Sequence, residues 1–143
     1  MNAHFIVRGV PVGKGRPRFK MVNNHAVAYT PEKTVNYETL VKLSYQQQCA
    51  GVKFPDGVPL SVRINAYFPI PKSTSKKKRA QMEAGEIMHL KKPDCDNVAK
   101  ACLDALNGIA FYDDSQVCDL TVMKLYSESP RVCITIKGVE DND

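Results

Sequence analysis

The chain has 143 residues, of which 43% are hydrophobic and 24% charged, and its formal net charge at pH 7 is +5. This length suits one domain, residues 1–143, with a sizeable core, and it is too short for two full domains. No apolar run reaches the roughly 20 residues that span a membrane, and no basic segment followed by an apolar stretch opens the chain, so we expect a cytoplasmic protein without a secretory signal.

The first half of the sequence predicts a strand, a basic loop, a helix and a second strand. The strand covers residues 4–10, and the loop at 11–24 is punctuated by glycine and proline. The helix starts with Pro31 at its first position and ends before Gly51. At 60–68, apolar and polar residues alternate, which is typical of a half-buried strand.

The second half predicts two helices and two strands. They are a basic helix at 73–84, a helix from Asp96 to Asn107, strands at 117–126 and 132–137, and a frayed acidic tail at 138–143. The resulting order, β-α-β-α-α-β-β, predicts a single α+β domain with a mixed β-sheet and packed helices. The last two strands are expected to pair as a hairpin, whereas the earlier strands need crossover connections.

Basic residues are concentrated in two segments. Residues 1–20 carry five basic residues and no acid, and residues 72–92 carry seven basic residues against two glutamates. A charge run is most often a solvated face. Two such runs that flank an acidic segment favour a nucleic-acid partner over a membrane or a small acidic ligand.

The acidic segment runs from Asp94 to Leu120 and holds six aspartates against Lys100 alone. A basic protein attracts polyanions, but an acidic pocket within it repels them unless a cation lies between. Carboxylates, a divalent metal and a phosphate backbone together are one physical solution to this conflict.

Within this segment, Asp94 and Asp96 form a D-x-D pair. In extended chain both carboxylates point to the same side and could share a Mg²⁺ ion, which prefers oxygen ligands. Lys100 lies one helical turn after Asp96 and could contact a phosphate. Asp114 could complete the ligand set, with Asp113 as a supporting or alternative acid. A helix cap, a surface ion pair and a plain turn are the structural alternatives, and spacing alone leaves both interpretations open.

Other motifs fail. The glycine-rich stretch at 9–15 has neither the spacing nor the Ser/Thr of a phosphate loop. The acidic segment lacks the glycine and final glutamate of an EF-hand. The five cysteines contain no C-x-x-C pair, so we expect reduced, packed thiols and no structural zinc.

Three groups of residues together resemble the RusA family of Holliday junction resolvases, found in bacteria and their prophages. The central one is K-P-D-x-D-N-x-x-K at 92–100, continued by D-A-L-N-G at 104–108 and D-D-S-Q at 113–116. Supporting basic motifs are G-K-x-R-P-R at 13–18, Y-T-P-x-K-T at 29–34 and P-K-S-x-S-K-K-K-R at 71–79.

The resemblance implies a homodimeric endodeoxyribonuclease that uses Mg²⁺, with Mn²⁺ as an alternative, to place symmetric paired nicks in four-way DNA junctions during recombination and repair. Asp94, Asp96 and Asp114 match the family's catalytic carboxylates, Lys100 matches its essential lysine, and Asp113 is the alternative to Asp114. The residues expected to hold DNA phosphates are Lys14, Arg16, Arg18, Lys20, Lys72, Lys76, Lys77, Lys78, Arg79 and Lys92.

Three rival functions use the same residues differently. A less selective Mg²⁺ nuclease would act on flaps, forks or other branched DNA, and only a comparison of substrates separates it from a resolvase. A junction-binding protein without cleavage is less consistent with the sequence, because a pure binder would gain affinity by losing the carboxylates. A nucleotide hydrolase needs a nucleoside pocket that the sequence does not indicate, so no nucleotide cofactor is expected.

Overall fold

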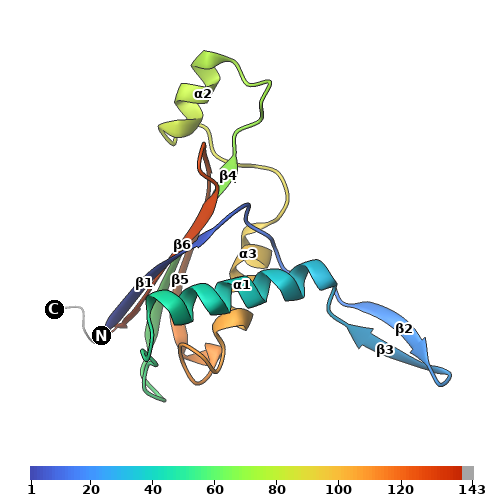
Figure 1. Ribbon diagram of the computed structural model, residues 1–143. Coiled ribbons are helices and arrows are strands. Elements are labelled where there is room, and N and C mark those ends of the chain that lie inside the picture. Colours follow the sequence, from blue (N-terminus) through green and yellow to red (C-terminus); the bar gives the residue numbers. More distant parts are fainter. Residues whose placement is uncertain (140–143) are drawn as a thin grey trace.

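A four-stranded mixed sheet forms the centre of this computed structural model, which describes residues 1–139 (Figure 1). The strands lie in the order β1-β6-β4-β5. Their bounds are β1 Asn2–Arg8, β4 Leu60–Pro69, β5 Val117–Ser127 and β6 Arg131–Gly138. β6 is antiparallel to β1 and to β4, whereas β5 is parallel to β4. The predicted α+β class with a mixed sheet is therefore confirmed.

The predicted hairpin of the last two strands is wrong, because β4 lies between β5 and β6. The inward residues of β4 explain its central place: Leu60, Val62 and Ile64 are at most 1% exposed. A strand this apolar is best covered when it has a neighbour on each side. The short connection at 128–130 joins β5 to β6 across the end of β4.

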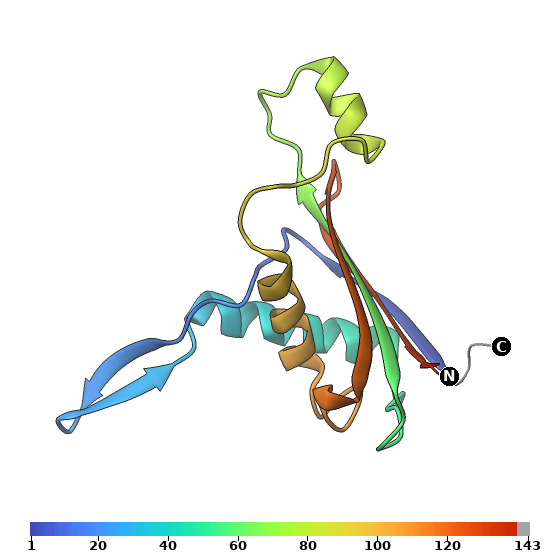
Figure 2. The same ribbon diagram turned by 180° about the vertical axis from the view of Figure 1, so that it is seen from behind.

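Two helices cover one face of the sheet, and a third stands at its end (Figure 2). α1 (Glu32–Gln48) and α3 (Cys95–Leu106) supply Val41, Tyr45, Val98 and Leu106 to the core, each at most 2% exposed. The amphipathic pattern predicted for α3 is thus confirmed. α2 (Lys76–Glu83) buries none of its residues. Among residues 1–139, no helix combines the length and apolar character needed to cross a membrane.

A two-stranded hairpin projects from the end of α1, away from the sheet (Figure 1). Its strands are β2 (Arg18–Val22) and β3 (His25–Tyr29), and every residue in both is exposed. The turn between them places Asn23 and Asn24 at φ values of 49° and 64°, which asparagine tolerates and which tight hairpin turns require. The sequence predicted a loop at 11–24 and no strand between 11 and 29, so these two strands are additional to the predicted order.

Two predicted boundaries shift, and the first of these shifts affects the candidate site. α3 begins at Cys95 with Asp94 at its N-cap, so Asp96 lies in the first helical turn rather than at the cap. The two carboxylates therefore do not share one side of an extended strand, as the D-x-D pattern predicted. The expected frayed tail at 138–143 is wrong for its first two residues, because Gly138 still belongs to β6 and the backbone N–H of Val139 donates to the carbonyl of Pro59 at 2.9 Å. Residues 140–143 lie outside the described part of the chain.

Candidate active site and nucleic-acid interface

Asp96, Lys100 and Asp114 meet at one cavity of about 290 Å³, lined also by Ala99, Leu103, Asp104 and Leu120. Asp96 and Lys100 are four residues apart on α3 and so lie one above the other on the same helix face. Asp114 arrives from a short 3₁₀ helix, η1 (Asp114–Gln116), that precedes β5. Three of the four predicted catalytic residues thus come together from segments separated in sequence.

The position of Asp114 is fixed by neighbouring amide side chains. The backbone N–H of Asp114 donates to Asn107 Oδ1 at 3.0 Å. Gln116 accepts from the backbone N–H groups of Tyr112 and Asp113 through Oε1, at 3.0 and 3.1 Å, and donates from Nε2 to backbone carbonyls at 55 and 58. Neither positioning role was predicted from the sequence, because the spacing of Asn107 and Gln116 from Asp114 matches no general motif.

Asp113 points to a different place from Asp114. Its carboxylate caps η1 by accepting the backbone N–H of Ser115 at 3.0 Å. The hydrogen bonds from Ser115 hold the pKa of Asp113 below its usual value. Asp113 also lines a separate cavity with Asp56, Ser115 and Cys118. Asp113 is therefore a turn-forming residue, and Asp114 is the one of the two acids that lines the cavity of Lys100.

Asp94 lies at the start of α3 but does not line the cavity of Asp96. Its carboxylate is 3.7 Å from the ammonium of Lys92, and both side chains are exposed. Lys124 on β5 holds the segment before Asp94 in place, because its ammonium donates to the carbonyls of Lys91 at 2.7 Å and Pro93 at 2.9 Å. No sequence pattern indicated this anchoring role of Lys124.

The carboxylates fit a hard divalent cation by donor chemistry. Asp96 and Asp114 share a cavity and Asp94 is two residues away, so the available ligands are oxygens of the kind that Mg²⁺ prefers. Among residues 1–139, no group of three or more His, Cys, Asp or Glu side chains is close enough to hold an ion without rearrangement. Lys100 has no ion pair within the same residues, so its ammonium is available to a ligand.

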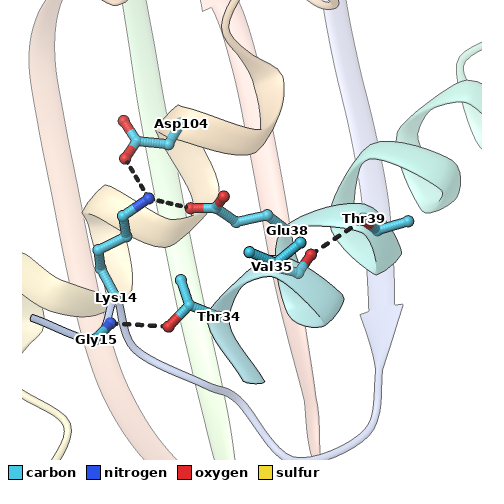
Figure 3. A network of polar contacts seen from close by, with 7 residues as sticks. All are labelled: Lys14, Gly15, Thr34, Val35, Glu38, Thr39 and Asp104. Atoms are coloured by element: carbon cyan, nitrogen blue, oxygen red, sulfur yellow. Dashed lines mark hydrogen bonds and ion pairs between the residues drawn. The ribbon is translucent and has the colours of Figure 1, made fainter. Parts of the chain in front are cut away.

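Lys14 is bound by protein carboxylates (Figure 3). Its ammonium lies 2.7 Å from Glu38 Oε2 on α1 and 3.0 Å from Asp104 Oδ2 on α3. Burial alone would lower the pKa of Lys14, but the hydrogen bonds and charges of the two acids raise it above its usual value. Lys14 therefore joins the loop to α1 through Glu38 and to α3 through Asp104.

The loop that carries Lys14 approaches α3 closely. The backbone N–H of Lys14 donates to the carbonyl of Asn97 at 2.8 Å. A Cβ on Gly13 would lie 2.5 Å from the Cβ of Pro93, so only glycine fits there. Next to it, the backbone N–H of Gly15 donates to Thr34 Oγ1 at 2.9 Å. These contacts place the basic loop beside the acidic motif.

A basic groove runs beside this contact, with a volume of about 560 Å³. Its charged lining consists of Lys14, Arg16, Arg18, Lys33 and Lys92, and no acid lines it. The groove brings together basic residues that the sequence placed in two separate segments. Lys33 belongs to the Y-T-P-x-K-T motif at 29–34 but was not among the predicted DNA-binding residues, and the structure adds it to the groove.

The remaining predicted DNA-binding residues lie outside this groove. Lys76, Lys77 and Lys78 are exposed on α2, at the end of the sheet (Figure 1). Arg79 binds Glu128 and donates to the carbonyl of Pro71 at 3.2 Å. The two others are Lys72, which lines a different cavity, and Lys20, whose ammonium is 5.4 Å from the ring centroid of Tyr29.

Carboxylates and a lysine around one cavity, next to a basic groove, are typical of a metal-dependent nuclease. The chain belongs to the RusA family: the family described as Endodeoxyribonuclease RusA matches residues 8–137, nearly the whole chain. The chain is also 40% identical over 140 residues to "Uncharacterized protein YqaN" of Bacillus subtilis (strain 168), covering 94% of this chain and 95% of that protein. The predicted family is confirmed, and it is a family of nucleases.

Proposed function

We propose that the protein is a Mg²⁺-dependent, structure-specific endodeoxyribonuclease that resolves four-way DNA junctions by symmetric paired nicks in recombination and repair. The observation that carries this proposal is the convergence of Asp96, Lys100 and Asp114 on one cavity, beside a basic groove that no acid lines. Family membership supports the nuclease class. Junction selectivity, metal use and symmetric nicking are the parts to be tested.

In this proposal Asp94, Asp96 and Asp114 hold the metal. A bound Mg²⁺ supplies an activated water and offsets negative charge on the phosphate, with Mn²⁺ as an alternative ion. Lys100, which has no ion pair among residues 1–139, binds the scissile phosphate and stabilises the charge that builds on it. Asn107 and Gln116 hold Asp114 at the cavity.

The DNA backbone follows the basic groove and reaches α2. Arg16, Arg18, Lys33 and Lys92 contact phosphates in the groove, and the lysines of α2 contact a second segment of duplex. Lys14 contributes positive charge but acts mainly as a structural bridge, because Glu38 and Asp104 occupy its ammonium. Such contacts give affinity and orientation without base readout.

A homodimer is the second part of the proposal, and the β2–β3 hairpin supports it. Directly paired residues of antiparallel strands share a face, so the register puts Phe19, Met21, Ala26 and Ala28 together on a face without charge. Phe19 and Met21 are 71% and 69% exposed. An isolated two-stranded hairpin is marginally stable in water, so a second copy covering this face would stabilise it.

The outward face of α1 offers a matching surface. Val35, Leu40 and Leu43 are 45%, 42% and 55% exposed there. Helix surfaces that face water normally carry charged residues rather than these. A two-fold dimer in which the hairpin of one copy covers α1 of the other would bury both faces, and it would match a two-fold junction with one active site per cleaved strand.

Sedimentation velocity tests the dimer. The variant with Phe19→Glu and Met21→Glu should sediment as a monomer, because the charges are placed on the face that the partner covers. Lys20→Glu lies on the opposite face of the hairpin and should sediment as the wild-type dimer. A monomeric wild type at micromolar concentration, or a double variant that remains dimeric, would exclude this interface.

Substrate comparison tests the activity. Wild-type protein should cleave a mobile four-way junction at least tenfold faster than a flap, a fork or a linear duplex. Asp114→Asn should abolish cleavage, whereas Asp113→Asn should retain most of it. Equal rates on all branched substrates would favour a less selective branched-DNA nuclease. Tight junction binding without cleavage under any metal would favour a junction-binding protein.

A further inference from the structure

We propose that a cavity at the C-terminal ends of β4 and β5 holds one unpaired nucleotide of the DNA substrate, an inference that rests on the proposed function. The cavity has a volume of about 470 Å³, within the usual range of small-ligand sites. It is lined by Val10, Phe68, Pro69, Ile70, Pro71, Lys72, His89, Lys91 and Tyr126. None of the residues assigned above to the metal or to the scissile phosphate takes part in it.

The lining has the chemistry that recognises a nucleobase. The ring of His89 stacks on Phe68 with centroids 3.7 Å apart and an interplanar angle of 9°, and Tyr126 meets it edge-on at 5.3 Å. Two prolines add flat apolar surface. Aromatic and apolar surfaces of this kind bind unstacked bases, because every base has a planar face.

His89 also has an unmet hydrogen-bonding group. It is 7% exposed, and its Nδ1 is buried without a hydrogen-bond partner among residues 1–139. Burying a polar atom without a hydrogen-bond partner costs free energy. The edge of a base carries both donors and acceptors, so a bound base could satisfy this ring where a purely apolar ligand could not.

The rim of the cavity is positively charged. Lys72 and Lys91 are exposed, and no acid lines the cavity. Neither lysine has an ion pair within residues 1–139. A nucleotide matches this distribution, with its base on the apolar floor and its phosphate at the lysines.

The cavity continues the basic groove. Val10 lines the cavity and Pro11 lines the groove, and likewise Lys91 lines the cavity and Lys92 the groove. Leu120, at the catalytic cavity, and Tyr126 are six positions apart on β5, or about 20 Å at roughly 3.3 Å per residue. A nucleotide bound here would therefore lie about 20 Å from the catalytic cavity. A branched substrate can supply an unpaired nucleotide at lower cost than an intact duplex can.

Binding of abasic junctions tests this site without cleavage, in an Asp96→Asn background. Val10 is 53% exposed, so Val10→Trp can fill the cavity without disturbing the core. Removing the base at one position per cleaved strand should weaken binding by about tenfold, in line with base–aromatic stacking. Val10→Trp should bind the intact junction about tenfold more weakly, with no further loss at that abasic position.

Lysine variants give a second readout. Lys72→Ala and Lys91→Ala should each weaken junction binding several-fold, whereas Lys137→Ala, an exposed lysine of β6, should not. If the protein binds junctions but the effects of Val10→Trp and of base removal add independently at every position, the nucleotide site is overturned and the proposed function is not. Failure of the protein to bind junctions at all would overturn the proposed function and this site with it.

Discussion

The ammonium of Lys14 lies between Glu38 and Asp104, and its side chain is 17% exposed. Removing it leaves two partly buried carboxylates without their cation, which costs more than losing an exposed pair. We expect Lys14→Met to lower the free energy of unfolding by about 2 kcal/mol. Urea denaturation measures this, with Lys20→Met on the exposed hairpin as the control. An unchanged midpoint for Lys14→Met would contradict the structural role of this residue.

His89 makes folding stability sensitive to mild acid. Burial, with Lys124 and Lys91 nearby, lowers the pKa of His89 from its usual 6.5. Because the folded-state pKa is lowered, this stability is complete above about pH 6.5 and is lost as the pH falls through the folded pKa. The Tm should therefore decrease between pH 7 and 5, and His89→Phe should reduce that decrease. An equal decrease in His89→Phe would contradict this assignment.

At the scale of elements, the close contact between the loop at 11–17 and α3 depends on Gly13. A Cβ there would approach Pro93 to 2.5 Å, so Gly13→Ala must move either the loop or the segment before Asp94. We expect a loss of about 2 kcal/mol in unfolding free energy and a larger loss in cleavage rate, because the groove and the acidic motif separate. Chemical denaturation and cleavage assays measure both; full activity with wild-type stability would contradict the contact.

The sequence predicted the long elements well and the short ones poorly, for identifiable reasons. β4 and α3 have apolar periodicities that only one secondary structure satisfies. The strands β2 and β3 are short and exposed on both faces, so no burial pattern marks them. The start of α3 was misplaced by two residues because Asp94 and Asp96 are both good N-cap residues, and only packing decides between them.

At the scale of the whole molecule, the sequence could not predict which strands are neighbours. β5 and β6 are consecutive and closely connected, yet β4 separates them, because strand order follows from burial of the whole sheet and not from local pattern. The same limit applies to the site. Spacing indicated Asp96, Lys100 and Asp114, but only the fold shows that Asp113 faces elsewhere and that acids hold Lys14.

In a junction-cleaving enzyme of this design, the basic groove and the lysines of α2 bind DNA, and the acidic cavity cleaves it. The acids should therefore be needed for cleavage and not for binding. Asp96 is exposed on the first turn of α3, so its replacement by asparagine should leave the fold intact. Removing a negative charge near the phosphates should leave junction affinity unchanged or raise it.

The most direct test is cleavage of a synthetic mobile four-way junction beside a matched linear duplex, with Mg²⁺ or EDTA, by wild type and Asp96→Asn. We expect paired symmetric nicks in the junction that require Mg²⁺, that disappear in Asp96→Asn while binding persists, and that spare the duplex. Cleavage in EDTA, cleavage by Asp96→Asn at the wild-type rate, or equal cutting of junction and duplex would contradict the proposed function.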